Sequence, residues 1–287
     1  MFQAKATTKI KMINMKKTLL AFAILGLSTG VMAQEAADKD IQAGLVMAIG
    51  PNFQKMGTKI IAKDGAGLDL TIGMNANWAF NDNLGFNTGV EFDFSTINYK
   101  TSADHDIYYW YNDSKILQQD EVAGTANKEL YKLSTRSQQG TYLTIPTMLL
   151  FRTNFIGYFR YFGKFGLRNS FLLSNKINDT GVNYTADIPG GTDEVQADNL
   201  NMKAKGDMFF FKSAVGLAGG AEWNFSGSTS LVAELGFYYG FTPLHLDKNE
   251  GNTTLFTAAG INGTPDDNHF SNQATQQQLQ FKVSILF

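Results

Sequence analysis

The 287-residue chain contains no cysteine, only 5 prolines and few charged residues. Without cysteine it can form no disulfide framework, thiolate metal site or cysteine nucleophile. Charged residues make up 17% of the chain, below the roughly 25% of an ordinary soluble domain. The 24 Lys and Arg against 26 Asp and Glu give a net charge of −2, so no basic excess is available for phosphates and we expect no nucleic-acid partner. Aromatic residues reach 13%, which argues against a disordered chain.

The N-terminal segment has the layout of a secretory signal peptide. Met15-Lys16-Lys17 opens a positive region, 18–30 is an apolar run, and Val31-Met32-Ala33 offers small residues at the cleavage position. We predict that residues 1–33 are an N-terminal extension plus signal peptide, cleaved near Ala33, and that 34–287 are one mature domain. A membrane anchor is the alternative, but the run is shorter than the ~20 residues that a spanning helix needs.

Alternation of apolar and polar residues predicts eight β-strands in the mature chain. They cover residues 41–50, 68–80, 84–95, 141–152, 158–174, 208–225, 229–241 and 275–287. The segment 141–152 is apolar on both parities, so its register stays open. Pointing Leu143, Ile145, Leu149 and Phe151 outward would turn Arg152 inward.

Charge is confined to one face of these strands. The apolar faces carry none, whereas the polar faces of the seven clear strands hold five acids and five bases: Asp69, Glu91, Asp93, Glu222, Glu234, Arg160, Lys164, Arg168, Lys212 and Lys282. A lipid-facing Lys or Arg at the bilayer midplane costs ~2–4 kcal/mol, whereas the outer face of a soluble sandwich meets water. The pattern therefore predicts an all-β, eight-stranded antiparallel up-and-down transmembrane β-barrel.

The same ten residues would form a charge network in the lumen. Buried charges must be paired or solvated, so we expect Glu91, Glu222 and Glu234 to lie close to Arg160, Arg168, Lys212 or Lys282. Such pairing would plug the lumen. An open, narrow, wet lumen with the same lining is the alternative.

Connection lengths agree with a barrel. The links at 81–83, 153–157 and 226–228 are short, those at about 51–66, 96–140, 175–206 and 242–274 are long, and the two kinds alternate. Outer-membrane barrels combine tight periplasmic turns with long external loops. Aromatic residues fall near both ends of the outward faces, as expected for two interfacial girdles.

The C-terminal segment has the pattern of an assembly signal. Leu279, Phe281, Val283, Ile285 and Phe287 occupy alternate outward positions up to the last residue, and the run is similar to the C-terminal β-signal of bacterial outer-membrane barrels. In addition, the stretch 142–146 (Tyr-Leu-Thr-Ile-Pro), followed by an apolar strand, a short turn and the strand 158–173, resembles the PorT-type outer-membrane β-barrel family of Bacteroidota. That resemblance implies a signal peptide, eight strands and a terminal aromatic residue.

Candidate chemistry is sparse, and we predict neither enzymatic activity nor a cofactor or metal. Asp104-His105-Asp106 lacks the spacing of a metal site, and 247–251 is a fragment of a calcium loop without the distal Glu. His245 beside several serines lacks the spacing of a catalytic triad. Tyr108, Tyr109, Trp110 and Tyr111 form the densest aromatic cluster outside a predicted strand. The cluster either binds a sugar or protein, or it packs against neighbouring loops or extends a hairpin above the bilayer.

The function expected from the sequence is a structural or surface-interaction role in the bacterial outer membrane, through long extracellular loops. The expected partners are outer-membrane lipid, the barrel-assembly machinery during biogenesis and an extracellular ligand or protein at the loops. A narrow channel or hydrophobic-ligand transporter is the first alternative, and a lipid-modifying enzyme at the rim is the second.

Overall fold

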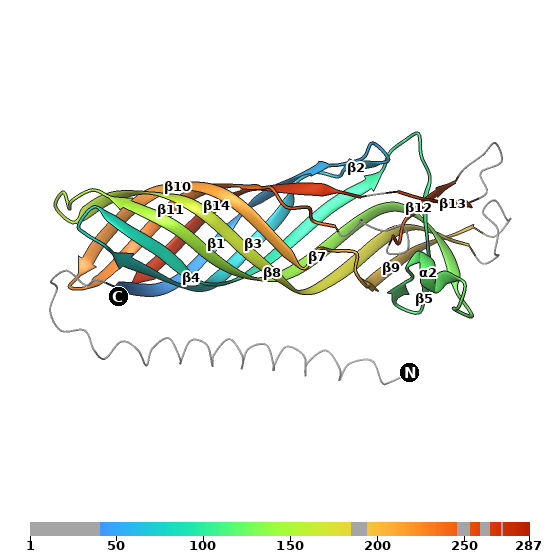
Figure 1. Ribbon diagram of the computed structural model, residues 1–287, viewed down its shortest axis with the longest axis horizontal. Coiled ribbons are helices and arrows are strands. Elements are labelled where there is room, and N and C mark those ends of the chain that lie inside the picture. Colours follow the sequence, from blue (N-terminus) through green and yellow to red (C-terminus); the bar gives the residue numbers. More distant parts are fainter. Residues whose placement is uncertain (1–40, 185–193, 246–252, 259–264, 271) are drawn as a thin grey trace, which may run out of the picture.

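The computed structural model describes residues 41–184, 194–245, 253–258, 265–270 and 272–287, so the predicted signal peptide lies outside the described residues. Eight long antiparallel strands run along the longest dimension of the molecule (Figure 1). They are β1 (Ile41–Met56), β3 (Gly67–Ala79), β4 (Leu84–Thr101), β7 (Glu129–Arg152), β8 (Phe159–Tyr184), β10 (Phe211–Ser226), β11 (Thr229–Gly240) and β14 (Ala274–Leu286).

These eight strands close on themselves. β14 pairs with β1 through contacts such as Leu45 with Ile285, and the ring continues through β3, β4, β7 and β8. β8 then pairs with β10 along Phe159–Phe171, and β11 joins β10 back to β14. Every neighbour in the ring is antiparallel, and each predicted strand segment lies within or overlaps one of these eight strands.

The sequence-based count of eight strands was too low, because the long connections contain strands of their own. Within the described residues the sheet has 14 strands. The additional ones are β2 (Ile61–Lys63), β5 (Ile107–Asn112), β6 (Lys115–Ile116), β9 (Glu194–Ala204), β12 (Phe256–Ala258) and β13 (Pro265–His269), and a short helix, α2 (Gln119–Val122), lies among them. Several of these strands have only two or three residues, and β5 is aromatic on both faces, so no alternation marked them.

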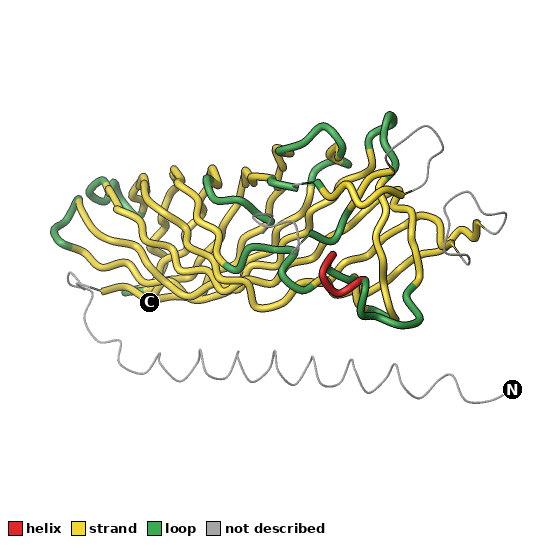
Figure 2. The backbone as a smooth tube through the Cα atoms, turned by 45° about the vertical axis from the view of Figure 1, so that its right-hand side comes forward, coloured by secondary structure: helices red, strands yellow, loops and turns green. Residues whose placement is uncertain are grey.

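The additional elements lie together at one end of the molecule, beside the far ends of β4, β7 and β8 (Figures 1 and 2). There β7, β8, β9, β6 and β5 pair in turn, and β5 pairs with β7 again, which makes a second, smaller ring. We call β2, β5, β6, α2, β9, β12, β13 and these far strand ends the cap. β6 and β9 are parallel, whereas the other cap pairings are antiparallel.

The tight connections between the described strands lie at the opposite end, as do the C-terminus and the start of β1 (Figure 1). Gly157 and Gly227 in two of these turns have φ of 64° and 53°, a left-handed conformation that glycine adopts without steric cost. Short and long connections therefore alternate as predicted. Among the described residues, no helix has the length and apolar composition needed to cross a bilayer.

The cap shares a hydrophobic core, here called the cap core, with adjoining residues such as Met208, Leu244 and Ala274. Sixteen buried residues form it: Ile61, Ile97, Tyr99, Ile107, Tyr109, Tyr111, Ile116, Tyr131, Leu133, Tyr142, Ile177, Met202, Met208, Leu244, Leu255 and Ala274. Such a core is typical of a folded unit rather than of separate loops. The predicted loops at 96–140 and 175–206 are therefore in large part sheet.

Candidate functional site: the charge network of the lumen and the cap above it

The outer surface of the long strands is apolar. On β11 the outward residues Leu235, Phe237 and Tyr239 are 57%, 47% and 42% exposed, whereas the preceding Glu234, on the other face, is only 3% exposed. The ambiguous strand β7 has the preferred register, with Leu149 and Phe151 outward. Arg152 hydrogen-bonds Gln42. Exposed apolar residues on every strand require an apolar surrounding rather than water.

Aromatic residues are exposed at both ends of this apolar band. Near the tight turns these are Trp78, Phe80, Tyr161, Trp223, Phe225 and Phe287. Near the cap they are Phe53, Phe94, Phe171, Phe210, Tyr239 and Phe241. The five residues of the C-terminal pattern, Leu279, Phe281, Val283, Ile285 and Phe287, are all exposed, each between 37% and 51%.

All ten charged residues assigned to the lumen from the sequence are buried: Asp69, Glu91, Asp93, Arg160, Lys164, Arg168, Lys212, Glu222, Glu234 and Lys282 are each at most 9% exposed. They come from six different strands, and strand alternation turns them to the inside. Unpaired charges at this burial would be prohibitively costly. Whether these charges pair with one another therefore decides whether the lumen is closed or open to solutes.

The centre of the network is Arg168 on β8. Its Nη2 donates to Glu91 Oε2 at 2.8 Å and to both oxygens of Asp93, at 3.0 and 2.9 Å. The second oxygen of Glu91 accepts from Lys282 Nζ at 2.7 Å, and the guanidinium lies 4.8 Å from the centroid of the Tyr238 ring. Two acids and two bases from the three strands β4, β8 and β14 thus meet at one level of the lumen.

Two further ion pairs lie closer to the tight turns. Arg160 and Glu222 are cross-strand neighbours joined by two hydrogen bonds of 2.6 and 2.9 Å, the bidentate geometry that makes Arg–carboxylate pairs strong. Lys164 donates to Glu234 at 2.6 Å. Glu91 and Glu222 thus pair with expected partners. Glu234 lies opposite the expected Lys282 in the β11–β14 register, but its ion pair is with Lys164.

Asp69 and Lys212 have amides rather than opposite charges as their nearest partners. Asp69 accepts from Asn52 and Gln278, each at 2.6 Å. Lys212 Nζ donates to Gln276 at 3.1 Å and lies 3.8 Å from the centroid of the Tyr142 ring. The sequence did not identify these amides as partners, because every strand that faces a lumen has neutral polar residues at alternate positions and nothing distinguishes these from the others.

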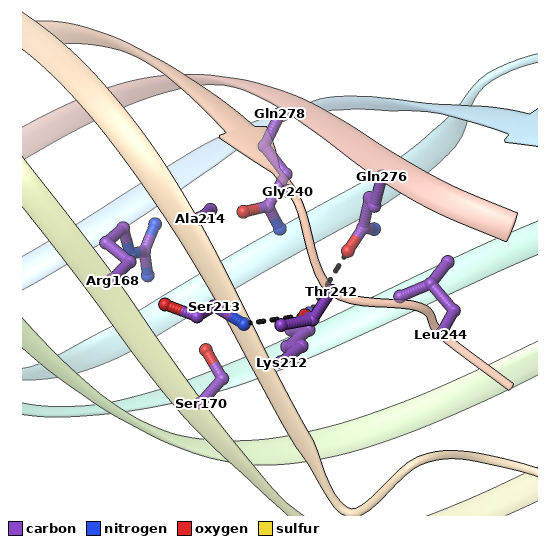
Figure 3. Close-up of a pocket in the computed structure, with 10 residues that line it drawn as sticks. All are labelled: Arg168, Ser170, Lys212, Ser213, Ala214, Gly240, Thr242, Leu244, Gln276 and Gln278. Atoms are coloured by element: carbon purple, nitrogen blue, oxygen red, sulfur yellow. Dashed lines mark hydrogen bonds between the residues drawn. The ribbon is translucent and has the colours of Figure 1, made fainter. Parts of the chain in front are cut away.

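Small hollows lie on both sides of the Arg168 level. Figure 3 shows the one nearer the cap, where Lys212 points to Gln276 and the backbone of Ser213 bonds Thr242. The other lies nearer the tight turns and is lined by residues including Asn77, Lys164 and Glu222. The Arg168 network separates the two.

The cap contains a buried ion pair that sequence reasoning did not find. Arg136 on β7 and Asp179 on β8 are register neighbours joined by two hydrogen bonds of 2.8 Å, and both side chains are fully buried. The guanidinium lies 5.3 Å from the centroid of the Tyr109 ring. Both residues belong to stretches predicted as loops, so no period-two signal connected them.

The aromatic cluster at 108–111 is not an exposed patch. It forms β5, and Tyr108, Tyr109 and Tyr111 are buried in the cap while Trp110 is half-buried. Tyr109 and Tyr131 pack with ring centroids 5.0 Å apart. The Tyr111 hydroxyl donates to Glu129 at 2.5 Å, and this bond lowers the pKa of Glu129 below its usual value. The binding-patch interpretation was therefore wrong, and the packing interpretation is correct.

The remaining sequence candidates show no assembled chemical site. His245 is buried with Nδ1 3.8 Å from Asp207 Oδ2, and that oxygen accepts from Gln138 at 2.8 Å. In the part of the chain that the structure describes, no group of three or more His, Cys, Asp or Glu could hold a metal ion. Most of the calcium-loop fragment at 247–251 lies outside the described residues.

Comparison with known proteins decides the family. Residues 32–246 match the family model described as outer membrane protein beta-barrel domain. The chain belongs to this family. Its membership accounts for the lipid-compatible exterior and places this β-barrel protein in the bacterial outer membrane.

Solved structures similar to this outer-membrane β-barrel protein share little sequence with it. Ail, the attachment invasion locus protein of Yersinia pestis, solved with the heparin analogue sucrose octasulfate, is 8% identical over 87% of this chain and 100% of its own, with a TM-score of 0.34. Neisserial surface protein A is 10% identical over 87% and 98%, with a TM-score of 0.30. The N-terminal barrel of Pseudomonas aeruginosa OprF is 8% identical over 85% and 97%, with a TM-score of 0.24. A search of curated proteins gives no match.

Proposed function

We propose that this protein is a sealed outer-membrane barrel whose folded cap is displayed outside the cell as an interaction surface. The main support for this proposal is the network of Arg168, Glu91, Asp93 and Lys282. Each of these residues is at most 5% exposed, and hydrogen bonds of 2.7 to 3.0 Å join them across the lumen. A solute would have to break these pairs to pass, and separating buried charges costs several kcal/mol.

The cap supports the same proposal, because it covers one mouth of the barrel. Tyr142, Met208 and Leu244 belong to the cap core and lie next to the lumen residues Lys212 and Gln276. The lumen therefore meets packed apolar side chains at that end rather than an open mouth. The lumen charges serve to fill and stabilise the barrel, and the surface offered to partners is the cap.

The proposed sidedness follows from the family's architecture. Outer-membrane barrels keep tight turns in the periplasm and place long connections outside, and here the cap elements all belong to the long connections. We infer that the predicted signal peptide at 1–33 directs export and that the barrel-assembly machinery recognises the C-terminal strand. A PorT-type relationship is a proposal that the Tyr142–Pro146 motif supports.

Planar-bilayer recording tests the seal. We expect the wild-type protein to give no steady conductance and Arg168→Ala to give frequent openings, because the shorter side chain leaves a gap between the two hollows. Lys63→Ala, which alters an exposed cap residue, is the matched control and should behave as the wild type. A large, steady conductance from the wild-type protein would refute the sealed lumen.

Sidedness can be tested because the native chain has no cysteine. Leu200→Cys places a thiol on the exposed face of β9 in the cap, and Asp82→Cys places one in an exposed tight turn. A membrane-impermeant maleimide added to intact cells should label the first variant and not the second. Labelling of Asp82→Cys alone would place the cap in the periplasm and contradict the proposal.

The second candidate function is a narrow channel, favoured by the hollows on the two sides of the Arg168 level. It requires that Arg168 move aside, since the pairs now separate the hollows. The bilayer recording distinguishes the candidates, because a channel would conduct with Arg168 in place.

A further inference from the structure

Three exposed lysines lie where the apolar band ends and the cap begins. Lys176 is on β8, Lys203 is on β9, and Lys205 follows β9 directly. We call them the rim lysines. Ile177 and Met202 are register partners in the β8–β9 pair, so the antiparallel register places Lys176 and Lys203 opposite each other. Both point outward, because Ile177 and Met202 point into the cap core.

Among the described residues the rim lysines form no ion pair, although Glu121 lies near enough to Lys205 to interact with its charge. Within the described ranges, no Asp or Glu oxygen lies within 4.0 Å of any of the three amino groups. The neighbouring Lys115, the register partner of Lys203, pairs instead with Glu121 at 2.7 Å. The rim lysines therefore carry positive charge that faces outward.

An apolar surface lies directly beside this charge on the membrane side. Leu173 is 55% and Phe210 is 64% exposed. The backbone of Leu172 bonds the carbonyl of Phe210 at 2.8 Å, so the two strands meet here. Phe210 packs against Phe209 and Phe211, with ring centroids 5.3 and 6.4 Å apart. Sequence alternation gave no reason to expect the outward position of Phe210.

The spacing between the two surfaces matches a lipid molecule. Lys176 lies three residues beyond Leu173, a rise of about 8 Å along the barrel axis for strands tilted by ~40°. The headgroup region of one leaflet is about 5–8 Å thick. If Leu173 and Phe210 contact acyl chains, the rim lysines therefore lie at the level of the headgroup phosphates.

We propose that the rim lysines bind the phosphate-bearing headgroup of a lipid in the outer leaflet, with its acyl chains against Leu173 and Phe210. Charge complementarity and continuity with the apolar band favour a lipid over a soluble anion, which would have no use for the exposed leucine and phenylalanine. The outer leaflet as the source rests on the proposed sidedness, whereas the binding surface itself does not.

Spin-labelled phosphatidic acid in phosphatidylcholine vesicles measures this binding on the full membrane-extracted protein. Its association relative to spin-labelled phosphatidylcholine should fall in Lys176→Gln/Lys203→Gln/Lys205→Gln, by up to about fivefold for each lysine removed. The triple Arg variant at the same positions should retain it. The matched control, Lys59→Gln/Lys63→Gln/Lys100→Gln, removes three exposed lysines from the other side of the cap and should change nothing.

Equal losses in both Gln triples would indicate a general effect of charge and overturn the proposal, as would no loss in the rim triple. Displacement of the labelled lipid by a soluble sulfated glycan as readily as by unlabelled phosphatidic acid would overturn the commitment to a lipid. Heat-modifiable migration verifies that each variant is folded. The vesicle result does not depend on which side the cap faces, so failure of the proposed sidedness shows only in the maleimide experiment.

Discussion

Removal of the Arg168 guanidinium tests whether the lumen charges stabilise the barrel as one network. In Arg168→Met, Glu91 keeps Lys282 at 2.7 Å. Asp93 keeps only the hydroxyls of Thr71 and Thr144, each at 2.6 Å. Within the described residues, no other base lies within 4.0 Å of Asp93. The variant therefore buries a carboxylate that has no hydrogen-bonded base, and only the more distant charge of Lys212 acts on it.

The expected cost follows from that geometry. Opposite charges about 4 Å apart attract by about 4 kcal/mol at an effective dielectric constant of about 20, and breaking a buried pair on one side costs about 3–5 kcal/mol. We therefore expect Arg168→Met to lower the free energy of unfolding by about 3–5 kcal/mol. The double variant Arg168→Met/Asp93→Asn removes both charges, so its cost should be about 2–3 kcal/mol smaller than that of Arg168→Met alone.

Urea unfolding in lipid vesicles, followed by tryptophan fluorescence and by heat-modifiable migration, measures these free energies. Lys63→Met, at an exposed cap position, is the control and should cost less than about 0.5 kcal/mol. A cost below about 1 kcal/mol for Arg168→Met, or a double variant less stable than the single one, would mean that water rather than Arg168 solvates Asp93. The sealed lumen would then lose its physical basis.

Three further predictions concern the wall, the exterior and the cap. A Cβ added at Gly216 would overlap the ring of Tyr238, so Gly216→Val should cost about 1–3 kcal/mol by urea unfolding, and an unchanged midpoint would contradict this packing. Leu235→Lys, in the middle of β11, should cost about 2–4 kcal/mol, whereas Leu200→Lys in the cap, equally exposed, should cost little; similar costs would place no membrane at β11. Tyr109→Ala should cost about 3–5 kcal/mol of cap stability, seen as rapid proteolysis of the cap beside an intact heat-modifiable barrel, and loss of both together would show that cap and barrel unfold as one unit.

Local sequence determined the barrel because its signal repeats every two residues. Along β11 the alternation of Glu234, Leu235 and Phe237 defines an inside and an outside without knowledge of any partner strand. The same logic turned all ten lumen charges inward. The alternation did not predict which charges form ion pairs. Glu234 lies opposite the expected base Lys282, yet it pairs with Lys164 on a strand that is not its neighbour, because such a pairing depends on ring closure and stagger.

The cap could not be predicted from local sequence, because only the tertiary structure determines it. Which faces of β5 and β9 are buried depends on packing between segments that are distant in sequence, such as Tyr109 against Tyr131. The buried pair of Arg136 and Asp179 and the outward lysines beside Leu173 likewise exist only once β7, β8 and β9 lie side by side. A pattern of period two reports which face a residue takes on its own strand, whereas contacts across the cap depend on loop closure that no local pattern encodes.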